Sequence, residues 1–319
     1  ITLNKEEAVF KNKEIISAIT LSKEQLDTIN GGFKGAPKFP MPNTLDYFLR
    51  YQHHYNDPNL FKYIKTSLTK MAYGGIYDQI GGGFSRYSVD ERWHIPHFEK
   101  MLYDNAQLVS IYSKAYLQDK NELYKNIVQG TLGFVNEELS ADNGAFYSSL
   151  DADSKNENDE LEEGVFYSWT KQELKTLLKD YELFANYYNV NTIGFWEKEL
   201  YVLIRNQSDA EFAKKNKLTK KELKDKIRSW KSILKTTRNK RSKPNLDDKI
   251  LTSWNALMLQ GYVDAYKAFD DETYLKKAIK IAEFLIHNQL RSDGGLNRNF
   301  KNGKSTINGY AEDYATVIQ

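Results

Sequence analysis

The sequence of 319 residues contains no cysteine. This absence excludes a disulfide framework, a thiolate nucleophile and a cysteine-ligated zinc or iron–sulfur centre. The sequence also lacks a run of 18 apolar residues and a secretory signal pattern, so we expect a soluble protein without a membrane span, with the cytoplasm as its default compartment. The formal net charge is only +2, and no overall field therefore favours nucleic acid or a membrane surface.

The main positive feature is a pattern that occurs three times: an aspartate, an apolar helical stripe and a glycine-rich break. Asp57, Asp119 and Asp270 are the predicted helix N-caps. In each copy the break follows the start of the stripe by 20 to 22 positions. Further helices are expected at 98–116, 250–269 and 311–318, after long polar loops.

Helices that alternate in this way, with short links at one end and long loops at the other, must bury their apolar faces on neighbouring hairpins. The pattern predicts an all-α fold in which helical hairpins form a ring, an (α/α) toroid, with short β-hairpins or strands in its long loops. The long loops would gather over one mouth. An insertion holds two more helical segments, at 171–188 and 220–234, and a short strand at 200–204.

The domain prediction is a linker with one short helix at 1–30 and the toroid at 31–319. Ile1 is not an initiator residue, and Gln319 follows an apolar helical run. We therefore expect this chain to be part of a longer one.

The densest group of ionisable residues lies between 86 and 105. Pro96 predicts a helix that starts near His97, which would place His97, Lys100 and Asp104 on one helical face. Histidine moves protons near neutral pH, and carboxylates orient it or act as acid or base. The alternative is a scaffold in which His97 and Glu99 cap the helix. The candidate catalytic residues here are His94, His97, Glu99 and Asp104, and the candidate substrate-binding residues are Arg86, Tyr87, Trp93, Lys100 and Tyr103.

Three more loops contribute candidates. The acidic stretch 155–162 is interpreted as a solvated loop and not as a calcium site, because Lys155 and a missing glycine break the calcium-loop pattern. On a ring, Asp104, Asn255 and Asp313 would occupy comparable inward positions. The same features would also line an inert, hydrated funnel. The further candidates are Asp153 and Asp313 for catalysis, and Asp151, Tyr167, Trp169, Asp248, Trp254 and Asn255 for substrate binding.

Two other site types are weighed and set aside. A His-x-x-His metal site at His94 and His97 is awkward because Pro96 separates the two imidazoles, and we predict no metal and no cofactor. The segment 214–243 carries 14 Lys or Arg and 2 acidic residues, but its apolar residues follow a helical stripe. We interpret it as an exposed amphipathic helix and do not expect nucleic acid as a partner.

Four strings resemble the spermatogenesis-associated thioredoxin-like family: 31–40 (GGFKGAPKFP), 93–106 (WHIPHFEKMLYDNA), 163–169 (EGVFYSW) and 247–257 (DDKILTSWNAL). The resemblance covers about residues 25 to 319. It implies a thioredoxin-like domain joined to an (α/α)6 toroid that is related to N-acylglucosamine 2-epimerases and six-hairpin glycosidases. We expect that the thioredoxin-like domain is missing from this chain, that residues 1–30 lead from it, and that the toroid stops early.

The leading functional hypothesis is a carbohydrate-active enzyme, either a sugar epimerase or isomerase or a glycoside hydrolase. In the first version His94 or His97 removes a proton beside a carbonyl and a second group returns it. In the second version Asp104 and another carboxylate, Asp153 or Asp313, flank the bond. The alternative class is a non-catalytic binding or scaffold module that serves the thioredoxin-like domain of the same full-length chain. The expected partners are thus a sugar or another small molecule, and that domain.

Overall fold

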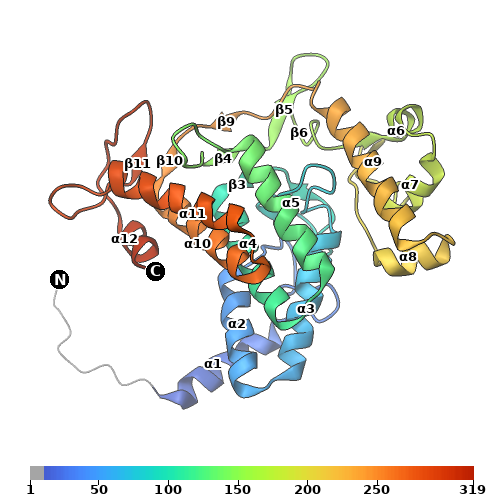
Figure 1. The fold of residues 1–319 in the computed structure, drawn as a ribbon. Helices are drawn as coiled ribbons and strands as arrows, with labels where there is room; N and C mark the ends of the chain where they lie inside the picture. The colour runs from blue at the N-terminus through green and yellow to red at the C-terminus, as the bar shows by residue number, and fades with distance from the viewer. Residues whose placement is uncertain (1–10) are drawn as a thin grey trace.

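The computed structural model describes residues 11–319, and helices dominate it. Helices α2, α4, α10 and α12 form one row, because α4 contacts both α2 and α10, and α10 contacts α12. Figure 1 shows their hairpin partners α3, α5 and α11 beside them. Within residues 11–319 this is an incomplete (α/α) toroid of three hairpins and the first helix of a fourth, and the predicted fold class is confirmed. The bounds are α2 (Pro42–Tyr55), α3 (Pro58–Tyr73), α4 (Leu102–Gln118), α5 (Glu122–Glu138), α10 (Thr252–Phe269), α11 (Glu272–Phe284), which continues into η1 (Leu285–Gln289), and α12 (Ala311–Ile318).

The short links between paired helices depend on local caps. The Asp57 side chain accepts a hydrogen bond from the Leu60 amide, as predicted. The predicted caps at Asp119 and Asp270 are wrong: Asn121 caps α5 and Asp271 caps α11, while Asp119 and Asp270 end the preceding helices. Each link contains two short polar residues: the first is the C-cap of the preceding helix, and the second is the N-cap of the following helix.

The N-terminal helix α1 (Asn12–Glu24) packs on the ring. Ile19 is buried in the main core, and Lys23 pairs with Asp57 at the start of α3. The predicted linker 1–30 thus contains the expected short helix. Its residues 1–10 lie outside the described part of the chain. None of the helices in residues 11–319 is both long and apolar enough to cross a membrane.

The insertion forms a second helical layer with its own core, at the right of Figure 1. The segment predicted as one helix at 171–188 is two helices, and the helix predicted at 220–234 continues to Arg238. The predicted strand 200–204 is confirmed only for its first two residues. The bounds are α6 (Lys171–Leu177), α7 (Tyr181–Tyr188), α8 (Asp209–Lys215), α9 (Lys220–Arg238), and the paired strands β7 (Trp169–Thr170) and β8 (Leu200–Tyr201).

The helix predicted to start near His97 starts at Leu102 instead, so that prediction is wrong. Residues 96–101 are extended because their backbone pairs with distant loops: β2 (Pro96–His97) with β1 (Tyr87–Ser88), and β3 (Lys100–Met101) with β4 (Ser149–Leu150). The proposed helical face that His97, Lys100 and Asp104 would share therefore does not exist.

The long loops do meet at one end of the helices, as predicted. Strand β4 pairs with β3 on one side and with β9 (Leu246–Asp247) on the other, which joins three loops from different hairpins. Strand β10 (Ile250–Leu251) pairs with β11 (Asn299–Phe300), and β5 (Asp153–Lys155) with β6 (Leu161–Glu163).

Two asparagines fix these loops to the helix starts in the same way. The Asn105 side chain accepts from the Phe84 amide and donates to the carbonyls of Phe84 and Met101. Asn255 makes the equivalent three bonds to Phe146 and Leu251. Both asparagines are the fourth residue of their helix and have no exposed surface. We call these contacts the asparagine clamps. They show that the sequence repeat is also a structural repeat.

The clamps predict a large cost for a small deletion. Asn105→Ala or Asn255→Ala leaves a buried amide and a buried carbonyl of the loop without partners, and each such group costs about 1–3 kcal/mol. We expect each variant to lower the free energy of unfolding in urea by about 2–4 kcal/mol. Asn288→Ala is the matched control, since the side chain of exposed Asn288 makes only one hydrogen bond, to the Phe284 carbonyl. Equal losses in all three variants would contradict the role of the clamps.

Candidate acid–base site

The extended backbone of residues 96–101 sends alternate side chains to opposite sides. His97 and Glu99 face one side, where the Nδ1 atom of His97 lies 2.7 Å from Oε1 of Glu163. The Nε2 atom of His97 lies 3.8 Å from Oε2 of Glu99, and that oxygen accepts from Arg86 at 3.3 Å. Together with Tyr103 and Asp104 at the start of α4, these residues form what we call the mouth cluster: Arg86, His97, Glu99, Tyr103, Asp104 and Glu163.

Asp104 is the carboxyl in this cluster with the most altered acidity. It lies in the first turn of α4 and is 7% exposed, and its Oδ2 atom has no hydrogen-bond partner among residues 11–319. Burial raises the pKa of Asp104 to about 7, against smaller opposing effects from the Tyr103 hydroxyl and the Arg86 charge. A helix N-terminus favours the carboxylate, but desolvation outweighs it here. Both protonation states are therefore populated near neutral pH.

Aromatic rings border the cluster. Tyr87 stacks on the His97 ring with centroids 4.9 Å apart, and Phe39 lies 5.0 Å from Tyr87. On the other flank Trp254 lies 4.8 Å from Tyr103. Three predicted substrate-binding residues, Tyr87, Tyr103 and Trp254, thus lie beside the predicted acid–base groups.

Glu163 is a member of the cluster that the sequence reasoning did not select. Its neighbour Gly164 adopts φ +74°, and a Cβ atom there would lie 2.4 Å from the Phe98 ring. Only glycine lets the chain pass this close, which brings Glu163 to His97. Glu163 pairs with Asp153 across the β5–β6 hairpin, so the candidate Asp153 shares its face of the hairpin. The sequence did contain a signal that could have identified Glu163: the Glu163-Gly164 pair opens one of the strings that carry the family resemblance.

Several other candidates are held by contacts within the protein. Trp93 has no exposed surface and donates its indole N–H to the Asn30 carbonyl. Trp169 is fully buried with Arg241 stacked 4.1 Å above it. Burial lowers the pKa of His94. Asp151 accepts from the Ala152 amide of its own loop, and half-buried Asp248 pairs with Lys301.

The ring positions need one correction. Asp313 is the third residue of α12, as Asp104 is of α4 and Trp254 of α10. Asn255 is equivalent to Asn105 and not to Asp104, so that part of the prediction is wrong. Asp313 has no exposed surface and accepts from the Ser253 amide and from Arg298. It therefore ties α12 to the start of α10.

Lys100 and Tyr167 face away from the mouth cluster. Lys100 follows Glu99 on the extended segment and points to the opposite side, where it pairs with Asp78. The Tyr167 ring lies 4.6 Å from the Lys100 amine. Sequence reasoning missed Asp78, which lies three residues before Gly81, the start of the first glycine break. In the described part of the chain no three His, Asp or Glu side chains are grouped so that they could hold a metal ion.

The fold and this cluster together define a helical toroid protein with a histidine–carboxylate site over its helix starts. No protein-family model matches the chain. The chain is 35% identical to uncharacterized protein B0495.5 of Caenorhabditis elegans, over 99% of its own length and 47% of that protein. It is 33% identical to spermatogenesis-associated protein 20 of mouse and of human, over 93% of its length and 42% of theirs. The similarity to spermatogenesis-associated proteins is confirmed, and the chain spans about half the length of these relatives.

Solved structures with a similar arrangement are more distant. Cellobiose 2-epimerase from Bacillus thermoamylovorans is 13% identical with a TM-score of 0.39, over 96% of both chains. An inactive variant of an α-1,6-mannanase from Salegentibacter is 12% identical with a TM-score of 0.46, over 81% of this chain and 50% of that one. Likeness at this level says nothing about the activity of this chain.

The acidity of Asp104 predicts a pH-dependent stability. Its pKa is raised from 3.8 to about 7 on folding, so it destabilises the folded state once ionised. Below about pH 4 Asp104 is protonated in both the folded and the unfolded state and does not lower the free energy of unfolding. As the pH rises to 7 the unfolded state releases its proton first, and the free energy of unfolding of the wild type falls. The unfolding free energy of Asp104→Asn minus that of the wild type should therefore increase by about 3–4 kcal/mol between pH 4 and pH 8. Urea denaturation at several pH values measures this difference, and a constant difference would contradict the burial of Asp104.

Proposed function

We propose that the mouth cluster is the active site of a carbohydrate-active enzyme, and that it performs proton transfer on a sugar, as in an epimerase or isomerase. The observation that supports this most is the combination of a histidine held by a carboxylate and a second carboxyl group with a pKa of about 7. A general acid or base works best when its pKa lies near the working pH.

In this proposal His97 is the base. The Glu163 carboxylate accepts a hydrogen bond from Nδ1 of His97, which leaves Nε2 as the nitrogen that takes the proton beside the sugar carbonyl. Asp104 gives a proton back on the other face of the planar intermediate. The Arg86 guanidinium stabilises the enolate oxygen that forms, and Tyr87, Tyr103 and Trp254 offer flat faces to the sugar ring.

A glycoside hydrolase is the second form of the proposal. Protonated Asp104 would then act as general acid, and Asp153 or Glu163 as the second carboxylate. The proton-transfer form is preferred because the best-defined contact is a histidine–carboxylate pair and not a pair of carboxylates.

The non-catalytic alternative also has an observation in its favour. Arg86 pairs with Glu99, Glu99 lies near His97, and His97 pairs with Glu163, so the four side chains form a continuous row of contacts, as in a structural network. In that case the chain would serve as a binding or scaffold module for a thioredoxin-like domain.

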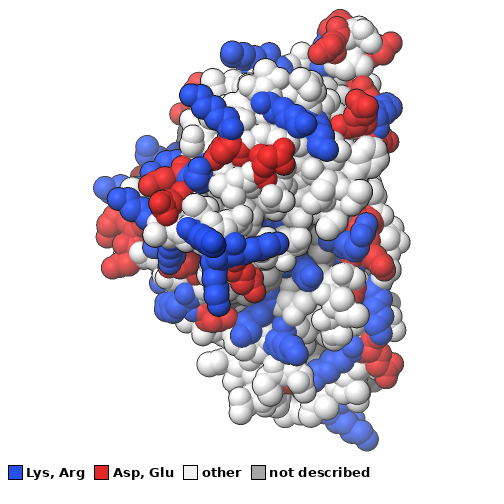
Figure 2. All heavy atoms as spheres, turned by 90° about the vertical axis from the view of Figure 1, so that its right-hand side faces the viewer, with Lys and Arg blue, Asp and Glu red and all other residues white. Residues whose placement is uncertain are grey.

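Binding of a polyanion by residues 214–243 is not favoured. Several of these cations are paired with acidic residues, as in Lys226 with Asp180 and Lys235 with Glu137. Figure 2 shows acidic side chains among the basic ones on the face at the right of Figure 1, and not a continuous basic patch.

The proposal predicts turnover that depends on two residues. The chain is incubated in D2O with a panel of aldoses, ketoses and disaccharides, and the products are analysed by NMR. We expect deuterium at the carbon beside the carbonyl, and a loss of about 100-fold or more in His97→Gln and in Asp104→Asn. His53→Gln is the matched control, because His53 is exposed on α2, outside the mouth cluster.

The outcomes separate the three alternatives. New reducing ends without deuterium would replace the isomerase with the hydrolase form. If no sugar in the panel is converted or bound, or if both variants retain full turnover, the enzyme proposal is wrong.

A further inference from the structure

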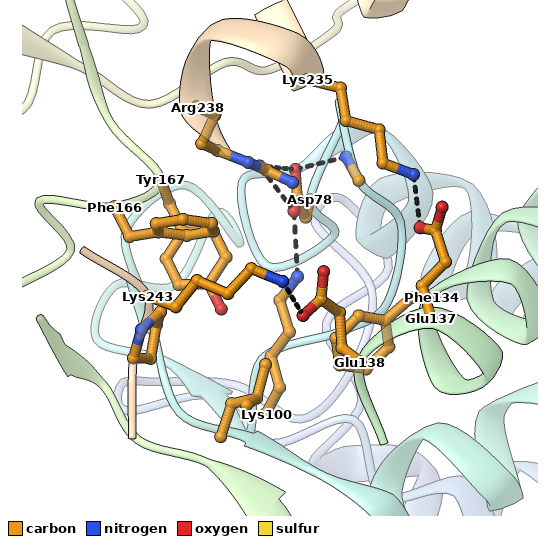
Figure 3. A pocket seen from close by; sticks show the side chains of 13 residues that line it. Asp78, Lys100, Phe134, Glu137, Glu138, Phe166, Tyr167, Lys235, Arg238 and Lys243 are labelled. Carbon is orange, nitrogen blue, oxygen red and sulfur yellow. Dashed lines mark hydrogen bonds and ion pairs between the residues drawn. The ribbon is translucent and has the colours of Figure 1, made fainter. Parts of the chain in front are cut away.

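A hollow lies between α5, α9 and the loop of residues 164–168, on the side of the extended segment opposite the mouth cluster, and its empty space of about 360 Å³ includes the solvent at its opening. Figure 3 shows side chains from these elements converging on it. Phe134, Leu150, Phe166 and Pro244 give it apolar walls. We call it the Lys100 hollow, after the amine at its base.

The interior of this hollow holds two cations and one carboxylate. Lys100 and Arg238 both pair with Asp78, at 3.0 and 2.8 Å, and they are 1% and 5% exposed. The Asp78 oxygens also accept from the amides of Ile80 and Gly81. Asp78 is therefore fully used, and one buried positive charge is left without a counter-charge.

The rim does not supply that counter-charge. Lys235 pairs with Glu137, and Lys243 pairs with Glu138, so each rim cation has its own carboxylate. With Lys100 ionised, the four cations and three carboxylates that line the hollow leave a net charge of +1. A buried charge without a partner is costly, and burial indeed lowers the pKa of Lys100 to about 8.

Two buried donors also lack acceptors. The Nε atom of Arg238 and the hydroxyl of Tyr167 have no hydrogen-bond partner among residues 11–319, although both residues line the hollow. The Lys100 amine also donates to the Gly82 carbonyl at 2.9 Å, and the rings of Phe134 and Tyr167 lie 4.5 and 4.6 Å from it. These neighbours are neutral and supply no negative charge. The hollow thus combines an excess positive charge, unused donors and apolar walls.

We propose that the Lys100 hollow binds a small organic anion, a carboxylate or phosphate monoester with an apolar body. The anion's oxygens accept hydrogen bonds from the Tyr167 hydroxyl and the Arg238 Nε–H and balance the charge of Lys100. The apolar body lies against Phe134 and Phe166. This site is separate from the mouth cluster and does not depend on the function proposed for it.

Isothermal titration calorimetry tests the proposal with two probes, benzoate for carboxylates and phenyl phosphate for phosphate esters. We expect saturable binding of at least one probe at one site per chain, with sodium chloride at the same ionic strength as the blank. The probe that binds identifies the headgroup that the hollow prefers. Above pH 8 binding should take up protons, since the anion favours the charged form of Lys100, and heats in buffers of different ionisation enthalpy measure this uptake.

Tyr167→Phe locates the site. It removes one hydroxyl that has no partner within the protein, so the fold is retained, and we expect affinity to fall about tenfold. Tyr181→Phe is the matched control: it removes another buried hydroxyl without a partner in the described residues, from a residue of the second core that does not line the hollow. Its affinity should stay within about twofold of the wild type. Absence of saturable binding for both probes, or equal affinity in Tyr167→Phe and the wild type, overturns the proposal.

Discussion

The extended conformation of residues 96–101 is the constraint on which the functional architecture depends. Two strand pairs hold it, Tyr87 with His97 and Lys100 with Leu150. Because successive side chains of an extended chain point to opposite sides, His97 and Glu99 enter the mouth cluster while Phe98 and Lys100 face the helical insertion. One short segment therefore contributes side chains both to the mouth cluster and to the Lys100 hollow.

Burial of charge then gives each site its character. On the mouth side the Asp104 carboxyl, in the first turn of α4, is buried, and this burial raises its pKa to about 7. On the other side α9 and the loop of residues 164–168 enclose the Lys100 amine and lower its pKa to about 8. Desolvation is the first cause in both cases, and it shifts an acid and a base toward neutrality from opposite directions. The asparagine clamps hold the loops over the helix starts and so maintain this burial.

The sequence predicted the features that depend on local pattern. Hairpin order, the glycine breaks and the bounds of α12 follow from helical periodicity and from short polar residues at the links. The start of α4 could not be predicted in this way, because the apolar spacing from Phe98 onward continues without a break into the helix. The helix does not extend toward Phe98 because the backbone of Lys100 and Met101 pairs with Leu150 and Ser149, about 50 positions away.

The candidate site was predicted in part for the same reason. His97, Glu99, Tyr103 and Asp104 are close in sequence and also form one cluster. Glu163 belongs to the mouth cluster and Asp78 to the Lys100 hollow, and each lies on a loop outside residues 97–104. No local sequence pattern connects either residue to that segment. The equivalence expected for Asn255 and Asp313 failed because it depends on where each helix begins: Asn255 is the fourth residue of its helix and Asp313 the third.

The tautomer of the His97 ring tests the central claim most directly, since it reports which side chain faces His97. Nitrogen-15 NMR of the imidazole should show the tautomer with hydrogen on Nδ1, and this population should change in Glu163→Gln but not in Lys100→Met. A ring that responds to Lys100→Met and is indifferent to Glu163→Gln would show that His97 and Lys100 share a face, and would contradict the extended segment.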